Sequence, residues 1–215
     1  MIRNAVKISP TGLQGDLVIP DHVRGVVLFA HGSGSSRTSS RNIYVAEMLN
    51  QAGIGTLLFD LLTPREEDED RVTCHLRFNI TLLAGRLMEA TDWFLDQRYG
   101  LPLGYFGAST GAAAALVAAA GRPNEVAVVV SRGGRPDLAA GVLPVVKAPT
   151  LLIVGEKDAP VIPLNEQAFH LLRTEKRFAL VPGASHLFEE PGTLRQAASL
   201  AQEWFLAHLH HAVTA

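Results

Sequence analysis

The sequence predicts an α/β protein built as a three-layer α/β/α sandwich, with a mainly parallel sheet and an antiparallel hairpin at its N-terminal end. From residue 23 onward, short stretches rich in β-branched residues alternate with longer stretches of helical periodicity. Parallel neighbours in a sheet need a crossover connection, and that crossover is usually a helix. The stretches 26–29 and 126–130 are apolar without interruption, which is typical of strands buried on both faces.

The hairpin is predicted at the start of the chain. Val6–Ile8 and Leu13–Ile19 are β-prone, and Pro10, Thr11 and Gly12 between them are turn formers. We expect these two strands to lie at an edge of the sheet.

After the hairpin, strands and helices are expected to alternate. The predicted strands are 23–29, 54–59, 103–106, 126–130, 150–154 and 177–181, and the predicted helices are 42–52, 76–97, 112–120, 164–172 and 193–208. Residues 64–72 are expected to form a solvated loop, because they include the charge run Arg65–Asp70. The stretch 131–149 is too short for a separate helical lid. We therefore expect one domain, residues 1–215, with an uncapped site.

The composition is that of a globular protein. Hydrophobic residues make up 47% of the chain and charged residues 19%, and the formal net charge is −2. Without a basic excess, binding to nucleic acid or to an anionic membrane is not expected. The single cysteine, Cys74, cannot form an internal disulfide, and residues 1–10 do not resemble a secretory signal. We expect a cytoplasmic protein in which Cys74 is a buried or half-buried packing residue.

A candidate nucleophile lies in the stretch Gly107–Gly111, which follows a predicted strand and precedes a predicted helix. A sharp strand-to-helix turn of this kind presents Ser109 above the sheet in a strained backbone conformation. Glycines two residues before and after the serine let the neighbouring strand and helix approach closely. The motif therefore predicts a serine nucleophile.

A serine nucleophile needs a base and an acid that orients the base, and both should follow strands directly. Asp60, Asp137 and Asp158 pass that test. Asp158 follows the penultimate predicted strand and falls between serine and histidine in chain order, the order expected of such a triad, so we select it. Asp60 and Asp137 have alternative roles as turn caps, and Glu156 is a weaker rival.

The predicted general base is His186, in the loop Pro182–Phe188 just past the last predicted strand. The competing interpretation is a buried structural histidine. The other histidines do not follow a strand in the required way, except His31, whose place in a glycine loop before the nucleophile favours a scaffolding hydrogen bond. The histidines set aside are His22, His170, His208, His210 and His211.

Acyl transfer develops negative charge on a carbonyl oxygen, which backbone amides stabilise by roughly 3 kcal/mol each. One predicted donor is the amide of Thr110, at the positive end of the helix that follows Ser109. The other is the amide of Ser33, in the glycine loop His31–Gly34.

With these motifs in order, the chain resembles the α/β-hydrolase fold and, within it, the small lidless branch related to dienelactone hydrolase. The resemblance covers almost the whole chain and is carried by Phe29–Ser36, Tyr105–Gly111 and Ser185–Pro191. It implies that Ser109, His186 and Asp158 form a catalytic triad. Dienelactone hydrolase itself uses a cysteine at the turn, whereas this chain has Ser109, which favours ordinary carboxylester hydrolysis.

Two further segments offer candidate substrate-binding residues. Arg132 or Arg135, after a predicted strand, could hold a substrate carboxylate; the alternative is a surface salt bridge, for example to Asp137. His75 or Arg77 could reach the cleft, although an exposed first helical turn is the alternative. No spacing of histidines and carboxylates predicts a metal site, and no cofactor is expected.

The leading functional hypothesis is a serine hydrolase that cleaves small esters or lactones through an acyl-enzyme on Ser109. A thioesterase or acyltransferase would use the same residues, and a non-catalytic relative that binds a small molecule is the alternative outside enzymes. The expected partner is a small-molecule substrate. The oligomeric state is left open, with a dimer as one alternative.

Overall fold

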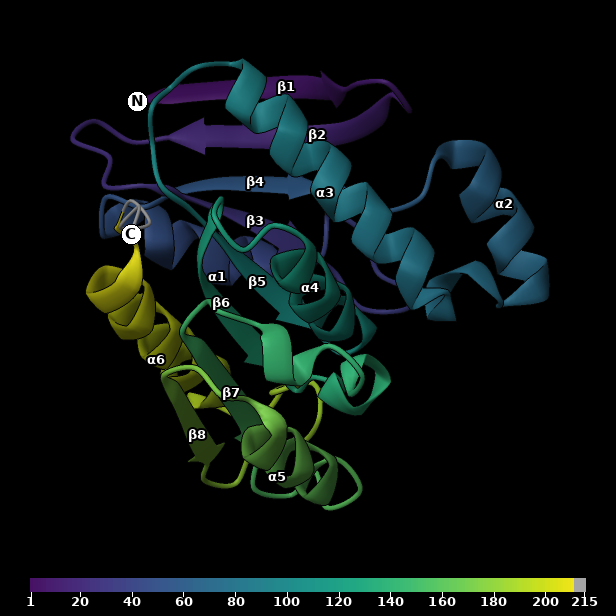
Figure 1. The fold of residues 1–215 in the computed structure, drawn as a ribbon, viewed down its shortest axis with the longest axis vertical. Helices are drawn as coiled ribbons and strands as arrows, with labels where there is room; N and C mark the ends of the chain where they lie inside the picture. The colour runs from purple at the N-terminus through teal and green to yellow at the C-terminus, as the bar shows by residue number, and fades with distance from the viewer. Residues whose placement is uncertain (211–215) are drawn as a thin grey trace.

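The computed structural model describes residues 1–210 and contains one sheet of eight strands in the order β1-β2-β4-β3-β5-β6-β7-β8 (Figure 1). The six strands β3 to β8 are parallel, as predicted, and the two N-terminal strands are antiparallel. The strands are β1 (Ile2–Ile8), β2 (Leu13–Ile19), β3 (Val26–Ala30), β4 (Gly55–Phe59), β5 (Leu103–Ala108), β6 (Val126–Arg132), β7 (Thr150–Gly155) and β8 (Lys176–Val181).

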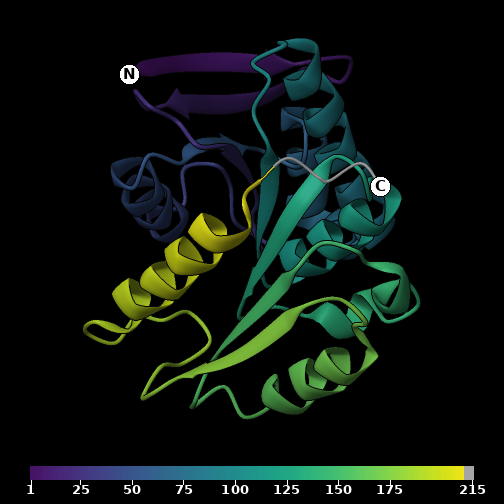
Figure 2. The ribbon, with the colours of Figure 1, turned by 60° about the vertical axis from the view of Figure 1, so that its left-hand side comes forward.

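Helices connect the strands and cover both faces of the sheet, so the three-layer prediction is confirmed (Figure 2). The α-helices are α1 (Ser40–Gln51), α2 (Pro64–Thr73), α3 (Ile80–Asp96), α4 (Thr110–Gly121), α5 (Ile162–Leu171) and α6 (Thr193–His208), and the 3-10 turns are η1 (Leu76–Phe78), η2 (Pro136–Ala139) and η3 (Leu143–Val145).

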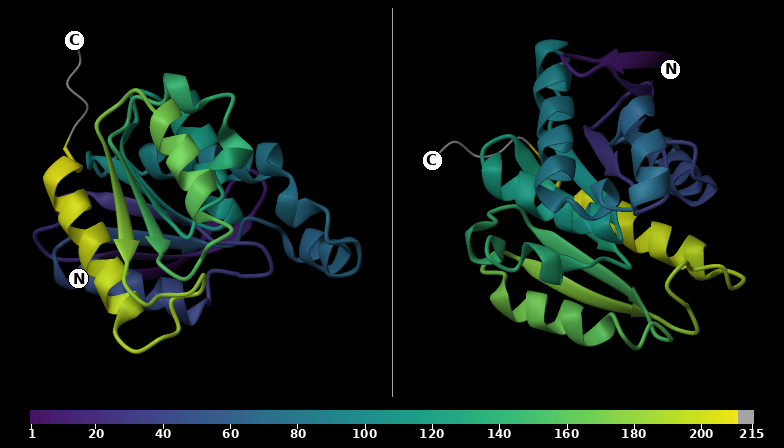
Figure 3. Two further views of the ribbon diagram at one scale, coloured as in Figure 1. Left: turned by 90° about the horizontal axis from the view of Figure 1, so that it is seen from below. Right: turned by 90° about the vertical axis from the view of Figure 1, so that its right-hand side faces the viewer.

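Each sheet face has its own apolar core. On one face α3 and α4 pack through side chains such as Leu87 and Leu116. On the other face α1 and α6 pack through side chains such as Leu49 and Phe205. Figure 3 shows the sheet between these two helical layers. Burial on both faces explains why the central strands are apolar along their whole length.

The predicted hairpin is present at the sheet edge, and β1 is longer than predicted. Ile2 pairs with Ile19 and Ile8 pairs with Leu13, so the whole of β1 is matched to β2. Strand β2 alternates buried and less buried residues, whereas β1 is exposed over its first four residues. In the exposed half of β1, two polar residues in a row separate Ile2 from Ala5, so the apolar–polar alternation typical of a strand is absent and the sequence pattern does not predict it.

The prediction of a loop over 64–72 is wrong, because these residues form α2, which projects from the body of the molecule (Figure 1). The Thr63 hydroxyl accepts a hydrogen bond from the Glu66 amide and the Glu66 carboxylate accepts one from the Thr63 amide, a capping box. Pro64 occupies the first helical turn, where it is tolerated. These start signals favour a helix more strongly than the charge run favours a loop.

The prediction of one helix over 76–97 is also wrong at its start. Residues 76–78 form the turn η1, and α3 begins at Ile80 after the Asn79 side chain caps its first amides. Cys74 is a further correction: it is exposed, with φ 55°, at the end of the projecting α2, where no core is available to bury it.

The connection from β6 to β7 holds the two short turns η2 and η3. Within residues 1–210, no helix has the length and apolar character needed to cross a membrane.

Candidate active site

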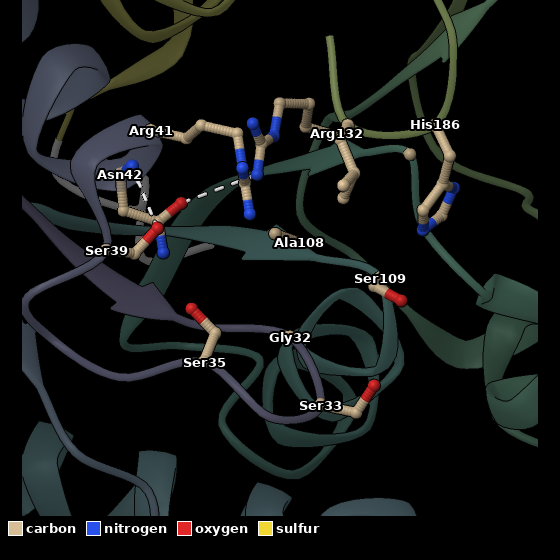
Figure 4. Close-up of a pocket in the computed structure, with 12 residues that line it drawn as sticks. Gly32, Ser33, Ser35, Ser39, Arg41, Asn42, Ala108, Ser109, Arg132 and His186 are labelled. Atoms are coloured by element: carbon tan, nitrogen blue, oxygen red, sulfur yellow. Dashed lines mark hydrogen bonds between the residues drawn. The ribbon is translucent and has the colours of Figure 1, made fainter. Parts of the chain in front are cut away.

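Ser109 occupies the sharp turn between β5 and α4 (Figure 4). Its backbone has φ 50° and ψ −120°, a conformation that residues other than glycine rarely adopt, so the predicted strained turn is present. A Cβ on Gly107 would collide with Ala112, and one on Gly111 would collide with the carbonyl oxygen of Ala30. Both glycines are therefore needed for the close packing of β5, α4 and β3.

Asp158 and His186 meet at the same edge of the sheet, although 28 residues separate them. Asp158 follows β7, and its side chain is buried at 7% exposure. His186 lies in the loop after β8, and its Nδ1 is 2.6 Å from Oδ2 of Asp158. With the proton on Nδ1 the ring donates to the carboxylate, which leaves Nε2 free to accept a proton.

The loop that carries His186 is fixed by two carboxylates. The Ser185 amide donates to Glu190 over 3.0 Å, and the Gly183 amide donates to Glu156 over 2.8 Å. Glu156, the weaker rival for the role of orienting acid, thus bonds to this loop. These contacts restrain the loop directly before His186.

The other candidate aspartates form ion pairs away from His186. Asp60 accepts hydrogen bonds from the Arg37 amide and guanidinium. Asp137 accepts two from Arg135, each of 2.8 Å. Of the three aspartates that follow a strand, Asp158 is thus the one that contacts a histidine.

Ser109 and His186 line one pocket of about 190 Å³. Figure 4 shows the His186 ring and Ser109 at one end of this pocket and the side chains of α1 at the other. Its remaining lining comes from the loop after β3, the start of α1, the ends of β5 and β6, and the loop after β8. These residues are Gly32, Ser33, Ser35, Ser39, Arg41, Asn42, Ala108, Arg132, Gly133 and Leu187.

His31 fixes the glycine loop from below. Its ring is buried, Nδ1 lies 3.0 Å from the Gly32 carbonyl oxygen, and Nε2 lies 3.0 Å from the Leu61 amide. Burial lowers the pKa of His31, so the neutral ring donates from Nδ1 and accepts at Nε2. With both nitrogens engaged, His31 has the geometry of a scaffolding residue.

Two amides beside Ser109 are available as hydrogen-bond donors. Neither the Ser33 nor the Thr110 backbone N–H donates to another of the residues 1–210. Thr110 is the first residue of α4, so its amide also lies at the positive end of the helix dipole. The arrangement can stabilise negative charge near Ser109.

The proposed substrate-binding residues separate into two groups. Arg132 lines the pocket and is buried at 7% exposure. Arg135 is paired with Asp137 and His75 is exposed, and neither lines the pocket. Arg77 is bound to the buried Asp70 and lies beneath the glycine loop.

Sequence reasoning missed the contribution of α1. Ser39, Arg41 and Asn42, at the start of this helix, line the pocket opposite His186 (Figure 4). The signal was the serine-rich stretch 33–40 leading into a helix whose first turn contains no acidic residue. His211 lies outside the described residues. Across residues 1–210, no group of three or more histidine, cysteine, aspartate or glutamate side chains has the geometry of a metal site.

Solved structures similar to this chain include one of high sequence identity and others that share only its fold. The chain is 60% identical to a dienelactone hydrolase from Anabaena variabilis, with a TM-score of 0.94 over 97% of this chain and 99% of that one. Est1E from Butyrivibrio proteoclasticus is 14% identical, with a TM-score of 0.74 over 94% of this chain and 98% of that one. An esterase domain from Rhodothermus marinus is 19% identical, with a TM-score of 0.76 over 98% of this chain and 100% of that one. The last two likenesses show the fold alone.

Curated proteins add a relative with a different name. Two Mycobacterium tuberculosis proteins, from different strains and both provisionally named phosphoribosyl transferases, are 56% identical over 206 residues, 95% of this chain. The chain spans about half the length of these relatives, 46% of each. No family model matches the chain. The full-length identity with the Anabaena hydrolase, together with the parallel sheet and the turn at Ser109, shows that the chain belongs to the dienelactone hydrolase-like family of the α/β-hydrolase fold.

Proposed function

We propose that this protein is a serine hydrolase that cleaves small carboxylic esters or lactones through an acyl-enzyme on Ser109. The observation that carries the proposal is that His186, which lines the same pocket as the strained Ser109, contacts Asp158 over 2.6 Å. A hydroxyl is a weak nucleophile at neutral pH, so it needs a base whose tautomer is fixed by an acid. His186 and its neighbour Asp158 would fill these two roles.

In the proposed acylation, Nε2 of His186 takes the proton of the Ser109 hydroxyl as its oxygen attacks the ester carbonyl carbon. Negative charge then develops on the carbonyl oxygen, and the Ser33 and Thr110 amides stabilise it. When the tetrahedral intermediate collapses, the bond to the alcohol oxygen breaks and protonated His186 gives its proton to the leaving alcohol. Asp158 stabilises the imidazolium throughout.

Deacylation repeats these steps with water as the nucleophile. His186 removes a proton from water, the oxygen attacks the acyl carbonyl, and the same two amides hold the charge. The acid is released as the Ser109 oxygen regains its proton from His186. The pocket holds about 190 Å³ and has no helical domain over it in residues 131–149, which suits a small substrate.

A thioesterase or acyltransferase would use the same side chains and is the second candidate. A thioester differs in its leaving group, and an acyltransferase differs in the acceptor that replaces water.

The transferase activity in the name of the longer relatives is not the activity that we propose for this pocket. We propose that the transferase name refers to the part of those proteins that this chain does not match, since the matched half is a hydrolase fold. The purified chain should then release no pyrophosphate from a phosphoribosyl donor.

The test is labelling with a fluorophosphonate probe, read by intact mass. Wild type should gain one probe mass, and Ser109→Ala should gain none while unfolding as wild type does. Ser33→Ala is the matched control: it removes a neighbouring hydroxyl from the same pocket but keeps the backbone amide, so labelling should persist. Folded wild type that stays unlabelled would contradict the proposal.

A further inference from the structure

Arg132 carries a buried positive charge that no carboxylate among residues 1–210 balances. Its Nε and Nη1 are buried without a hydrogen-bond partner in this part of the chain, and Nη2 reaches Oδ1 of Asn42 only over 3.5 Å. The guanidinium lies 5.9 Å from the ring centre of Phe106 and 5.7 Å from that of Phe188. Charged side chains are rarely this buried unless an opposite charge accompanies them.

A second cation faces the same space. Arg41, in the first turn of α1, lines the pocket, and Figure 4 shows its guanidinium beside that of Arg132. Burial first, and repulsion from Arg41 second, lower the pKa of Arg132 to about 10, so Arg132 remains charged at neutral pH. The carboxylate nearest Arg41 belongs to Glu189, 3.5 Å away and 64% exposed.

The start of α1 adds further donors. The amides of Ser40 and Arg41 donate to no other residue within 1–210, and the first turn contains no acidic side chain. The helix dipole places partial positive charge at this point, and the hydroxyls of Ser35 and Ser39 line the pocket beside it. We name Ser39, Arg41, Asn42 and Arg132 the arginine wall.

We infer that the arginine wall is an oxyanion subsite, and that the substrate is an ester carrying a carboxylate or phosphate group besides the bond that Ser109 attacks. The inference rests on the proposed function for the location of the reacting bond. The anion itself is inferred independently, because the unbalanced charge of Arg132, the neighbouring Arg41 and the free helix amides attract an oxyanion whether or not Ser109 reacts.

A purely structural role for Arg132 would be stacking between Phe106 and Phe188. Stacking would explain why the guanidinium lies near the two rings, but a methionine would fill the same space without burying a charge. It also leaves the second cation and the free amides of α1 unexplained. A bound oxyanion accounts for all three, because it supplies the counter-charge that Arg132 lacks, a second anionic partner for Arg41 and an acceptor for the helix start.

The test measures thermal unfolding with inorganic phosphate and, separately, with succinate, each against chloride at equal ionic strength. Binding to the folded state raises the melting temperature. Wild type should be stabilised, and Arg132→Met should bind the anion about 10-fold or more weakly, as expected for one charge-assisted contact. Arg135→Met is the matched control and should respond as wild type does. The stronger of the two responses identifies phosphate or carboxylate as the natural group.

Equal stabilisation of wild type and Arg132→Met, or no stabilisation of wild type, would overturn the inference. Arg132→Lys keeps a charge and should retain part of the response, which separates lost charge from lost packing. If Arg132→Met does not fold, Arg41→Met provides the same comparison. Fluorophosphonate labelling tests the proposed function separately. If wild type is labelled but no anion raises its melting temperature, the subsite alone is refuted. If an anion raises the melting temperature but wild type is not labelled, the hydrolase proposal alone is refuted.

In wild type, the bound anion should also protect Ser109 from the probe, and Arg132→Met should lose this protection. A charged and a neutral ester of similar size, 4-nitrophenyl hemisuccinate and 4-nitrophenyl butyrate, complete the test. Wild type should favour the charged ester in kcat/KM by about 10-fold, and Arg132→Met should not. Equal use of both esters by wild type would count against the substrate class.

Discussion

The pocket has two walls that differ in how their charges are balanced. On what we call the triad wall, Ser109 and His186 of the proposed triad line the pocket, and the Asp158 carboxylate lies 2.6 Å from Nδ1 of His186. The Ser185 amide, next to His186, donates to Glu190. On the arginine wall, Arg132 has no counter-charge within residues 1–210 and Arg41 has an exposed one. The proposed acid–base pair thus has its contact within the protein, whereas the proposed oxyanion subsite would take its counter-charge from a ligand.

This difference separates catalysis from recognition. A triad must hold its geometry before the substrate arrives, because orientation contributes to the rate only if it needs no rearrangement. A recognition subsite gains from groups that are left unsatisfied until the ligand binds, since a substrate without the anion then leaves buried charge unpaired. Variants that damage one wall should therefore leave the other intact.

The largest expected effect comes from Asp158→Asn on the triad wall. The amide cannot stabilise the imidazolium or select the tautomer of His186, so kcat should fall by about 10⁴-fold. Turnover of a 4-nitrophenyl ester measures the loss. Phosphate should still stabilise this variant as it does wild type.

Asp137→Asn is the control for that change, because it alters an aspartate that also follows a strand but bonds to Arg135. Its turnover should remain within a few-fold of wild type. Comparable losses in the two variants would show that Asp158 does not act through His186.

His31→Ala is expected to have a smaller effect, a loss of stability that involves both walls of the pocket. The glycine loop above His31 supplies Ser33 to one end of the pocket and Ser35 to the other. The substitution leaves the Leu61 amide and the Gly32 carbonyl without their buried partner, so the free energy of unfolding should fall by about 2–4 kcal/mol. Urea unfolding of this variant beside His170→Ala, which removes an exposed histidine, measures the difference.

The same histidine gives a pH dependence of known sign. Burial lowers the pKa of His31 below its ordinary value of 6.5, so on acidification the unfolded chain takes up a proton before the folded one does. Stability from the neutral ring is present above pH 6.5 and is lost as the pH falls below it. His31→Ala should therefore lose less stability than wild type between pH 7.5 and pH 5, and parallel losses would contradict this account.

The triad wall could be predicted from the sequence because each of its members directly follows a strand. Ser109 follows β5, Asp158 follows β7 and His186 follows β8, so strand order alone indicated where the three side chains lie. Helix α2 illustrates the opposite case: Thr63, Pro64 and Glu66 are helix start signals, but the charge run that follows them is equally typical of a solvated loop.

The arginine wall could not be predicted in the same way. Arg132 and Arg135 lie in one short stretch, and both follow apolar residues. Their difference arises from distant segments: β6 continues through Arg132, which places it between Phe106 and Phe188. Arg135 has Asp137 two residues away, a partner that the local sequence does contain.

A smaller effect, opposite in sign to most core substitutions, is expected from Arg132→Met without an oxyanion. Removing a buried, unbalanced charge should raise the free energy of unfolding by about 1–2 kcal/mol, after the loss of two contacts with aromatic rings. Urea unfolding in chloride buffer measures the change. A loss of stability would show instead that the guanidinium is a structural element of the core.

The smallest effect is expected from Arg135→Met, and it makes the comparison of the two arginines sharpest. Arg135 is 39% exposed and forms its ion pair with Asp137 at the surface, where such pairs contribute at most about 1 kcal/mol. Its loss should lower stability slightly, whereas loss of Arg132 should raise it. Because Arg135 does not line the pocket, ester turnover and phosphate stabilisation should match wild type. If Arg135→Met instead weakened the phosphate response as much as Arg132→Met does, general positive charge near β6 would explain the anion binding, and the specific geometry of the arginine wall would not.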